Sequence, residues 1–160
     1  MSLSGRVYRL PMNSGSMTAN KQDLFTVIAS SLIPLWIEEI RLDPISSLAT
    51  EYLLSMKLFT GAYTSGAGGT TITPSKNQFN DAAAGATCRI TSSTQTSTSG
   101  GGTNTIMDAG NWNLVNGWAW QPIDTDHRIA IPMSGQFSLS LDTTPSSATV
   151  NGCLIFREMF

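Results

Sequence analysis

Apolar and polar side chains alternate along many short runs of this 160-residue chain. Because successive side chains of a strand point to opposite faces, a period of two predicts half-buried β-strands. The runs span residues 6–10, 36–42, 87–91, 117–121, 128–133, 136–142 and 149–159. In two of them the alternation places large residues together: Trp36, Ile40 and Leu42 on one face, and Trp118 and Trp120 on another.

The stretch from Ser46 to Phe59 allows two interpretations. It can be read as a helix, but its second half alternates, with Leu54, Met56 and Leu58 on one side and the polar Ser55 between them. We favour a strand there.

Turn-forming residues separate the runs, and two of these segments are long. They cover roughly residues 61–81 and 92–111 and are rich in Ser, Thr and Gly. Several short strands without convincing helices indicate a sandwich or barrel. We therefore predict an all-β fold: a jelly-roll-like antiparallel β-sandwich of about eight strands with long Ser/Thr/Gly loops. The long loops are expected at the ends of the sandwich, where they make contacts.

The length predicts one domain, residues 21–160, preceded by an N-terminal strand or arm, residues 1–20. That first segment holds one short strand, followed by Pro11 and a Gly/Ser turn. Two alternatives stay open for it: an ordinary strand of the same subunit, or an arm that adds a strand to a neighbour.

Charged residues make up only 12% of the chain, and the net charge is −2. Lys and Arg occur singly along the sequence, whereas a phosphate-backbone binder needs clustered cations. We therefore expect no nucleic-acid partner unless a basic patch assembles in an oligomer. The first ten residues lack the apolar core of a signal peptide, and the longest apolar stretch, residues 24–37, is too short to span a bilayer. The expectation is a soluble product made without export, with no membrane partner.

Two cysteines, Cys88 and Cys153, are too few for a disulfide framework. We expect small buried thiols, with a single bridge between neighbouring strands as the alternative.

Candidate catalytic chemistry is sparse. His127 is the single histidine, and it follows Asp124 and Asp126 in a segment typical of a turn. The three could hold a cation, but a metal site on a jelly roll needs several histidines. The glycine-rich run from Thr64 to Thr71 lacks the Lys-Ser/Thr ending of a phosphate-binding loop.

Paired carboxylates for glycoside hydrolysis must face one cleft. Glu38 and Glu39 are adjacent on a predicted strand, so their side chains should point to opposite faces. We therefore predict that the chain is not an enzyme, with no catalytic residue, no cofactor and no metal.

Aromatic side chains are the remaining candidates for an interaction surface: Tyr63, Trp112, Trp118 and Trp120. The tryptophans could stack on a sugar ring. Alternatively they fill the sandwich core or a subunit interface, where Trp is enriched.

Three stretches of the chain carry a resemblance. Residues 61–95 hold a Gly/Thr loop, a Pro and an Asp-Ala-Ala-Ala step into a strand. Residues 111–131 hold a Gly-Trp segment leading through a Pro and an Arg to an apolar strand, and residues 148–158 form a last strand that closes on an acidic residue. In these motifs the chain resembles a family of small all-β proteins encoded in the structural gene clusters of tailed bacteriophages.

The resemblance implies a virion component, made in the host cytoplasm and located on the capsid surface. The expected role is that of a capsid decoration or cement protein, with the major capsid protein and further copies of itself, as a homo-dimer or homo-trimer, as partners. The alternative is a tail- or fibre-associated module that binds glycans or a receptor through Trp118, Trp120 or Tyr63.

Overall fold

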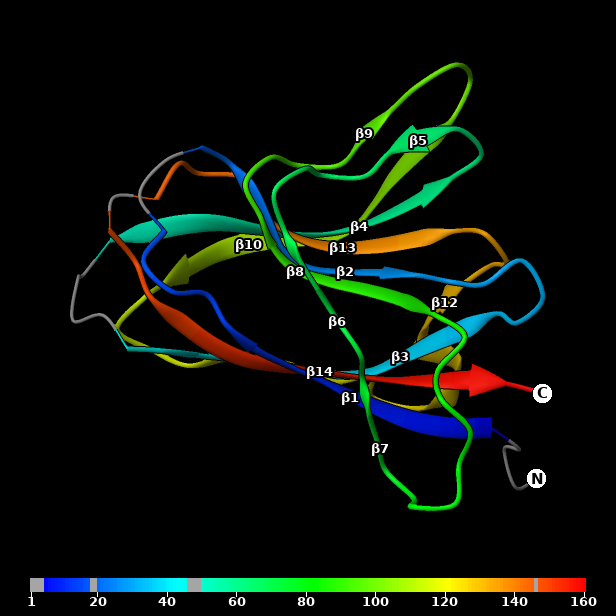
Figure 1. Cartoon of the computed structure of the whole chain (residues 1–160). Coiled ribbons are helices and arrows are strands. Elements are labelled where there is room, and N and C mark those ends of the chain that lie inside the picture. The colour runs from blue at the N-terminus through cyan, green and yellow to red at the C-terminus, as the bar shows by residue number, and fades with distance from the viewer. Residues whose placement is uncertain (1–4, 18–19, 46–49, 146) are drawn as a thin grey trace.

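The computed structural model describes residues 5–17, 20–45, 50–145 and 147–160. In these residues the chain forms two antiparallel sheets of six strands each, packed face to face as a sandwich (Figure 1). The described part of the chain holds no α-helix and one short 3-10 turn, η1 (Thr125–His127). The all-β sandwich is therefore confirmed, with more strands than the eight or so predicted.

We call the first sheet sheet A, and its strand order is β11-β3-β14-β1-β7, with β12 also pairing with β3. Its strands are β1 (Gly5–Asn13), β3 (Leu35–Pro44), β7 (Ser75–Lys76), β11 (Trp118–Trp120), β12 (Ile129–Ile131) and β14 (Val150–Met159). The last strand of the chain thus lies between the first and the third, and it pairs with both over most of its length.

The second sheet, sheet B, has the order β10-β4-β13-β2-β8-β6. Its strands are β2 (Gln22–Ile28), β4 (Glu51–Thr60), β6 (Thr70–Ile72), β8 (Thr87–Ser92), β10 (Thr103–Asn113) and β13 (Gln136–Leu141). The first four strands of the chain alternate between the sheets, so each long connection crosses the sandwich rather than forming a hairpin.

The core lies between the two sheets and follows the predicted alternation. Tyr8 and Phe156, partners on β1 and β14, stack with their ring centroids 5.4 Å apart. From β13 in the other sheet, Phe137 and Leu139 belong to the same core cluster and have no exposed surface. In the alternating runs 6–10, 136–142 and 149–159 the face that carries most of the large apolar residues is therefore buried, as the period of two predicts.

The first predicted loop, residues 61–81, is interrupted by three short strands. It contains β5 (Tyr63–Thr64), β6 and β7, and β6 and β7 join the edges of the two different sheets. The second predicted loop was wrong in extent, because most of residues 92–111 belong to β9 (Ser97–Thr98) and to the long strand β10. The sequence of β10 does not alternate because nine of its eleven residues are exposed.

The N-terminal strand β1 belongs to the sandwich of its own chain. It pairs with β14 from Gly5 to Asn13, and Tyr8 and Leu10 are fully buried in the core. Within the single chain, therefore, this segment is a strand of the sandwich.

The favoured strand within Ser46–Phe59 is also found, as β4; residues 46–49, where the helical alternative begins, lie outside the described residues. No helix in the described residues has the length and apolar character needed to cross a bilayer.

The two cysteines are free and lie on different sheets, Cys88 on β8 and Cys153 on β14. The expectation of unbridged thiols is confirmed. Burial raises the pKa of Cys88 to about 12, with the nearby Glu158 carboxylate adding to the effect. Cys153 is only half-buried, which differs from the expectation of two core residues.

Glu158, the acidic residue near the end of β14, is buried with 1% exposure. Its Oε1 accepts hydrogen bonds from the backbone amides of Gly85 at 2.6 Å and Ala86 at 3.0 Å. This carboxylate therefore fastens the segment that precedes β8 to the last strand.

Candidate functional site: two unlike outer faces

The four aromatic candidates do not form one surface. Trp112 is 3% exposed, and its indole N–H donates to the backbone oxygen of Asn116 at 2.8 Å. Tyr63 lies on β5, where its hydroxyl donates to the backbone oxygen of Ser134 and burial raises its pKa. Only Trp118 and Trp120 lie together.

Trp118 and Trp120 share a face of β11, as predicted, opposite Leu42 and Ile40 on β3. Since Leu42 and Ile40 are fully buried, this face is the inner one, and both indoles pack against the core while keeping part of their surface exposed. The two indoles therefore cover the part of the core that lies next to β11.

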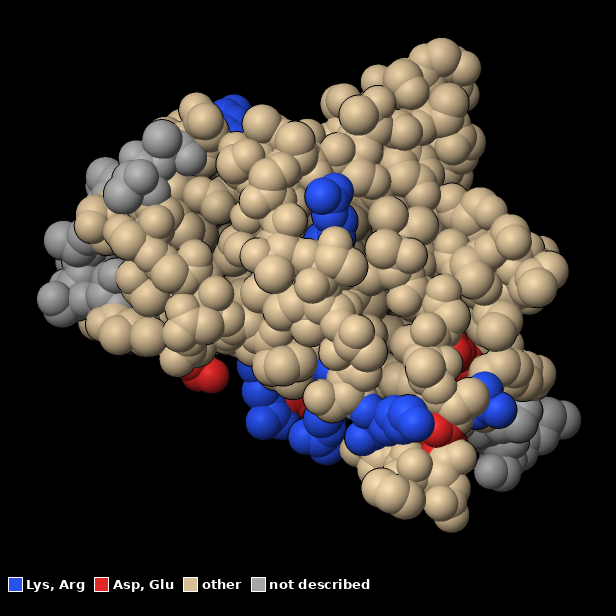
Figure 2. All heavy atoms as spheres, in the orientation of Figure 1, with Lys and Arg blue, Asp and Glu red and all other residues tan. Residues whose placement is uncertain are grey.

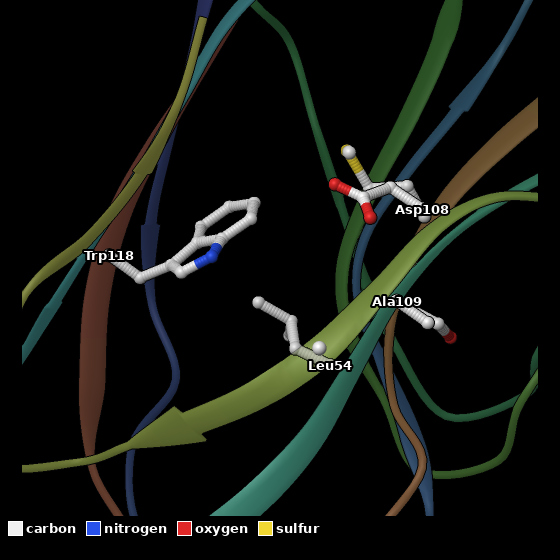
Figure 3. A pocket seen from close by; sticks show the side chains of 7 residues that line it. Leu54, Asp108, Ala109 and Trp118 are labelled. Atoms are coloured by element: carbon white, nitrogen blue, oxygen red, sulfur yellow. The ribbon is translucent and has the colours of Figure 1, made fainter.

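Beside Trp118 a small pocket of about 60 Å³ opens between the two sheets. In Figure 3 the carboxylate of Asp108 on β10 and the Trp118 ring point toward one another across it, with Leu54 between them. Gly110 lines this pocket, and the space beside it is open, because a Cβ at this position would meet no atom within 4 Å. The full lining is Leu54, Ser55, Met56, Asp108, Ala109, Gly110 and Trp118.

The outer face of sheet B is covered by the chain's own loops. β5 and β9 pair as a short ribbon that stands on this sheet in Figure 1. Below the ribbon, Asp23 on β2 accepts from the backbone N–H of Thr96 at 2.8 Å and from its hydroxyl at 2.7 Å. Ser65 likewise donates to the side chain of Gln136 at 2.6 Å. The Ser/Thr/Gly loops were expected at the sandwich ends, but these parts of them lie on a sheet face.

Glycine makes this close cover possible. A Cβ on Gly66 would lie 2.1 Å from the backbone oxygen of Thr94, and one on Gly102 would lie 1.7 Å from that of Ala62. Real Cβ atoms do not approach backbone oxygen so closely, so the loops need residues without side chains here.

The outer face of sheet A carries large side chains, and among the described residues no ribbon lies on it. Directly opposed side chains of neighbouring antiparallel strands point the same way, so the rows across the sheet follow from the register. One row runs Arg9–Ile155–Glu39 and the next Pro11–Cys153–Arg41. The outward residues of the three central strands are Gly5, Val7, Arg9, Pro11, Asn13, Trp36, Glu38, Glu39, Arg41, Asp43, Asn151, Cys153, Ile155, Arg157 and Met159.

A β-bulge in β3 corrects two of the sequence predictions. The register with β14 shifts so that Ile37 opposes Phe156 and Glu39 opposes Ile155, which leaves Glu38 as the extra residue. An extra residue breaks the alternation. As a result Glu38 and Glu39 both lie on the outer face, not on opposite faces. Trp36 also points outward rather than sharing a face with the buried Ile40 and Leu42.

Both carboxylates are paired with arginines. Glu38 lies between two of them: the Nε of Arg157 is 2.7 Å from its Oε1, and the Nε of Arg128 is 2.9 Å from its Oε2. The Arg128 guanidinium also stands 5.4 Å from the centre of the Trp36 ring, within the range of a cation–π contact. Glu39 pairs with Arg41, whose side chain is 64% exposed.

A second pocket, of about 150 Å³, opens on this face. It is lined by Arg9, Glu39, Arg41, Cys153 and Ile155. Arg9 has a hydrogen bond to the amide oxygen of Asn77 at 3.3 Å rather than a carboxylate partner. Partial burial raises the pKa of the Cys153 thiol against the opposing effect of the two arginines. The pocket therefore combines two guanidinium groups, one of them paired with the Glu39 carboxylate, with the side chains of Ile155 and Cys153.

Cations that are scattered in the sequence thus gather in the structure. Figure 2 shows Lys and Arg concentrated along the side that β1, β14 and β3 form, while most of the surface in that view carries neither charge. Sequence reasoning missed this site. The available signal was that Arg9 and Arg157 fall on outward positions next to apolar outward residues, Val7 beside Arg9 and Ile155 beside Arg157.

The Asp-Thr-Asp-His segment forms the predicted turn. Asp124 caps η1 by accepting from the backbone amides of Asp126 and His127, and its carboxylate also contacts the His127 ring at 2.7 Å. In the described residues no group of three His, Cys, Asp or Glu side chains is arranged to hold a metal ion.

Comparison of the chain with protein-family models, with curated proteins and with solved structures found no match in any of the three.

Proposed function

We propose that the chain is a structural protein of a virion, a capsid decoration or cement protein that binds the major capsid protein and assembles as a homo-oligomer. The observation that carries this proposal is the contrast between the two outer faces. One is sealed by the chain's own loops, and the other is an open sheet of arginines, Trp36, Ile155 and Cys153. Arginine and aromatic residues are enriched at protein interfaces.

The resemblance to small all-β phage proteins supports the same role. A protein that covers a repeating lattice binds many equivalent positions, so modest contacts per copy suffice when copies are joined. A rigid sheet face suits such docking because few side chains lose freedom on contact.

A jelly roll is part of this proposal. It is built from two sheets whose strands follow a double Greek-key path. Support comes from the matching orders β3-β14-β1 and β4-β13-β2, in which the last two long strands each lie between strands from the first part of the chain.

The experiment is a comparison of virions with and without the chain. Particles that lack it should lose integrity at lower temperature, under pressure or in chelator, and purified protein added back should bind and restore their stability. Equal stability of the two particles would refute the cement role.

A second candidate, a glycan-binding module of a tail or fibre, is favoured by one observation. Trp118 and Asp108 face each other across a pocket, and an aromatic ring with a carboxylate is a common pairing for stacking on a sugar and accepting from its hydroxyls. A glycan array should then give signals that Trp118→Ala removes and Tyr63→Phe keeps. An array without signal for the wild-type protein would dismiss this candidate.

A further inference from the structure

We infer that the outer face of sheet A docks on an acidic surface of another protein, and that the pocket between Arg9 and Arg41 receives a carboxylate side chain of that partner. The inference rests on the proposed function in one respect, namely that the acidic partner is the capsid shell.

The first step concerns the apolar side chains of this face, which a solvent-exposed sheet face ordinarily does not carry. Val7, Ile155 and Cys153 point outward from adjacent strands and are half-exposed. Trp36 is half-exposed on the next strand, beside Arg128. On sheet B the outward positions of β13 are Gln136, Ser138 and Ser140 instead, and those are covered. The larger apolar side chains thus lie on the uncovered face.

The second step is the charge of this side of the molecule. The outer face of sheet A carries the cations Arg9, Arg41 and Arg157, with Arg128 beside Trp36, and the carboxylates Glu38, Glu39 and Asp43, a balance of one positive charge. The rest of the chain carries five cations and eight carboxylates, a balance of three negative charges. The protein is therefore polarised, and its open face is complementary to an acidic surface.

The third step is the pocket itself. Among the described residues Arg9 has no carboxylate partner, and Arg41 is paired with Glu39 alone. A guanidinium group has five N–H donors, so each arginine retains donors for a further acceptor. Two parallel N–H groups of a guanidinium match the two oxygens of a carboxylate. A volume of about 150 Å³ admits the end of a Glu or Asp side chain, with Ile155 and Cys153 available to its methylene groups.

Other occupants fit less well. A nucleic-acid backbone carries a charge at every phosphate and needs several clustered cations in excess, and a face with one net positive charge does not supply them. A second copy in two-fold contact would present the same positive balance to itself. The free edge of β10 is a poorer docking element, because a bulge between Ile106 and Asp108 interrupts it and bulges and charges protect edges from pairing.

The test uses Cys153 as a reporter, because its thiol lies in the pocket while Cys88 is buried and serves as an internal control. Maleimide labelling of Cys153 is followed by mass spectrometry in the presence of poly-L-glutamate. At a probe concentration about ten times its Kd, labelling should slow about tenfold, and high salt should remove the effect. Poly-L-lysine should give no protection.

Arg9→Glu with Arg41→Glu should abolish the protection, whereas Lys21→Glu, an exposed cation outside sheet A, should leave it unchanged. An unreactive Cys88 in each variant shows that the fold is intact. The inference is overturned if poly-L-glutamate does not protect the wild-type thiol or protects the double variant equally. Stronger protection by a DNA duplex overturns it in favour of nucleic acid. Protection that grows with protein concentration alone overturns it in favour of a second copy.

Binding to decoration-free particles separates the inference from the proposed function. Undiminished binding of the double variant refutes the docking face and leaves the function standing. Failure of the wild-type protein to bind particles, combined with protection by poly-L-glutamate, refutes the function and supports the acidic-partner face.

Discussion

Asp23 accepts both the backbone N–H and the hydroxyl of Thr96 through a single carboxylate oxygen, at 2.8 and 2.7 Å. The two residues are 73 positions apart, and both are buried. This contact joins a Ser/Thr-rich segment that the sequence presents as loose to the second strand of the sandwich. The loop is therefore part of the folded structure, fixed by a buried carboxyl group whose two oxygens both accept hydrogen bonds.

Removing that carboxylate should destabilise the protein strongly. Asp23→Ala leaves the Thr96 amide and the Ser140 hydroxyl, which donates to the other carboxylate oxygen at 2.6 Å, without their acceptor. We expect a loss of about 3 kcal/mol in the free energy of unfolding, and about 1 kcal/mol for Asp23→Asn, which keeps one acceptor. Urea denaturation measures both. Asp108→Ala, on the exposed edge strand, is the control and should change stability by less than about 0.5 kcal/mol.

Asp142 should make stability depend on pH in the acidic range. Its partial burial opposes ionisation, but hydrogen bonds from Lys57, Ser55 and Gln95 outweigh this and lower its pKa. Because the folded pKa is lowered, the stabilisation is present above the unfolded value of about 3.9 and is lost as the pH falls through the folded value.

Lys57→Met removes the ion pair, in which the two charged atoms lie 2.6 Å apart, so the Asp142 pKa should rise. Carbon-detected NMR titration of the carboxylate measures this shift directly. The variant should also lose less stability than wild type between about pH 5 and pH 2. If the free energy of unfolding falls equally with decreasing pH in the two proteins, the Lys57 ion pair does not lower the Asp142 pKa.

His127 should titrate above its ordinary range. The hydrogen bond and the charge of Asp124 raise its pKa, with a smaller contribution from Asp126. A raised value means that the protonated ring is favoured, up to a pH above the usual value of about 6.5. His127 is the single histidine, so its ring resonances give one clean curve. Asp124→Asn should return the midpoint toward 6.5, and an unchanged midpoint would show that the contact is absent in solution.

Two glycines should respond in opposite ways to the same added methyl group. At Gly110 the new Cβ meets no atom within 4 Å, and the backbone lies outside the left-handed region. Gly110→Ala should therefore be neutral or stabilise by about 0.5 kcal/mol, since alanine restricts the unfolded chain. Gly102→Ala places its Cβ 1.7 Å from a backbone oxygen and should cost more than about 1 kcal/mol. Thermal denaturation of the pair tests this, and equal melting temperatures would contradict it.

The strand faces were predictable where pairing is regular. The alternation of Phe137, Leu139 and Leu141 with serines placed the right side chains in the core, and so did that of Val7 and Arg9 with Tyr8. A period of two is a local property, and a regular strand preserves it from end to end.

The predicted strand faces were wrong where pairing with a neighbouring strand inserts an extra residue and breaks the alternation. The bulge at Glu38 reverses the face of Trp36 and brings two adjacent glutamates to the same side. No residue in that segment predicts the bulge, because the bulge arises from the pairing of β3 with β14, a strand that follows more than a hundred residues later in the sequence. The same is true of β10, whose exposed sequence lacks alternation although it pairs along β4.

By itself the sequence determined the fold class and the inward faces of the regular strands. The tertiary structure alone decided which sheet face is sealed and which is open. That decision depends on contacts between distant residues, such as Asp23 with Thr96 and Glu38 with Arg157. Local patterns carry no information on such pairs, because the free energy that fixes them comes from groups brought together only when both sheets have formed.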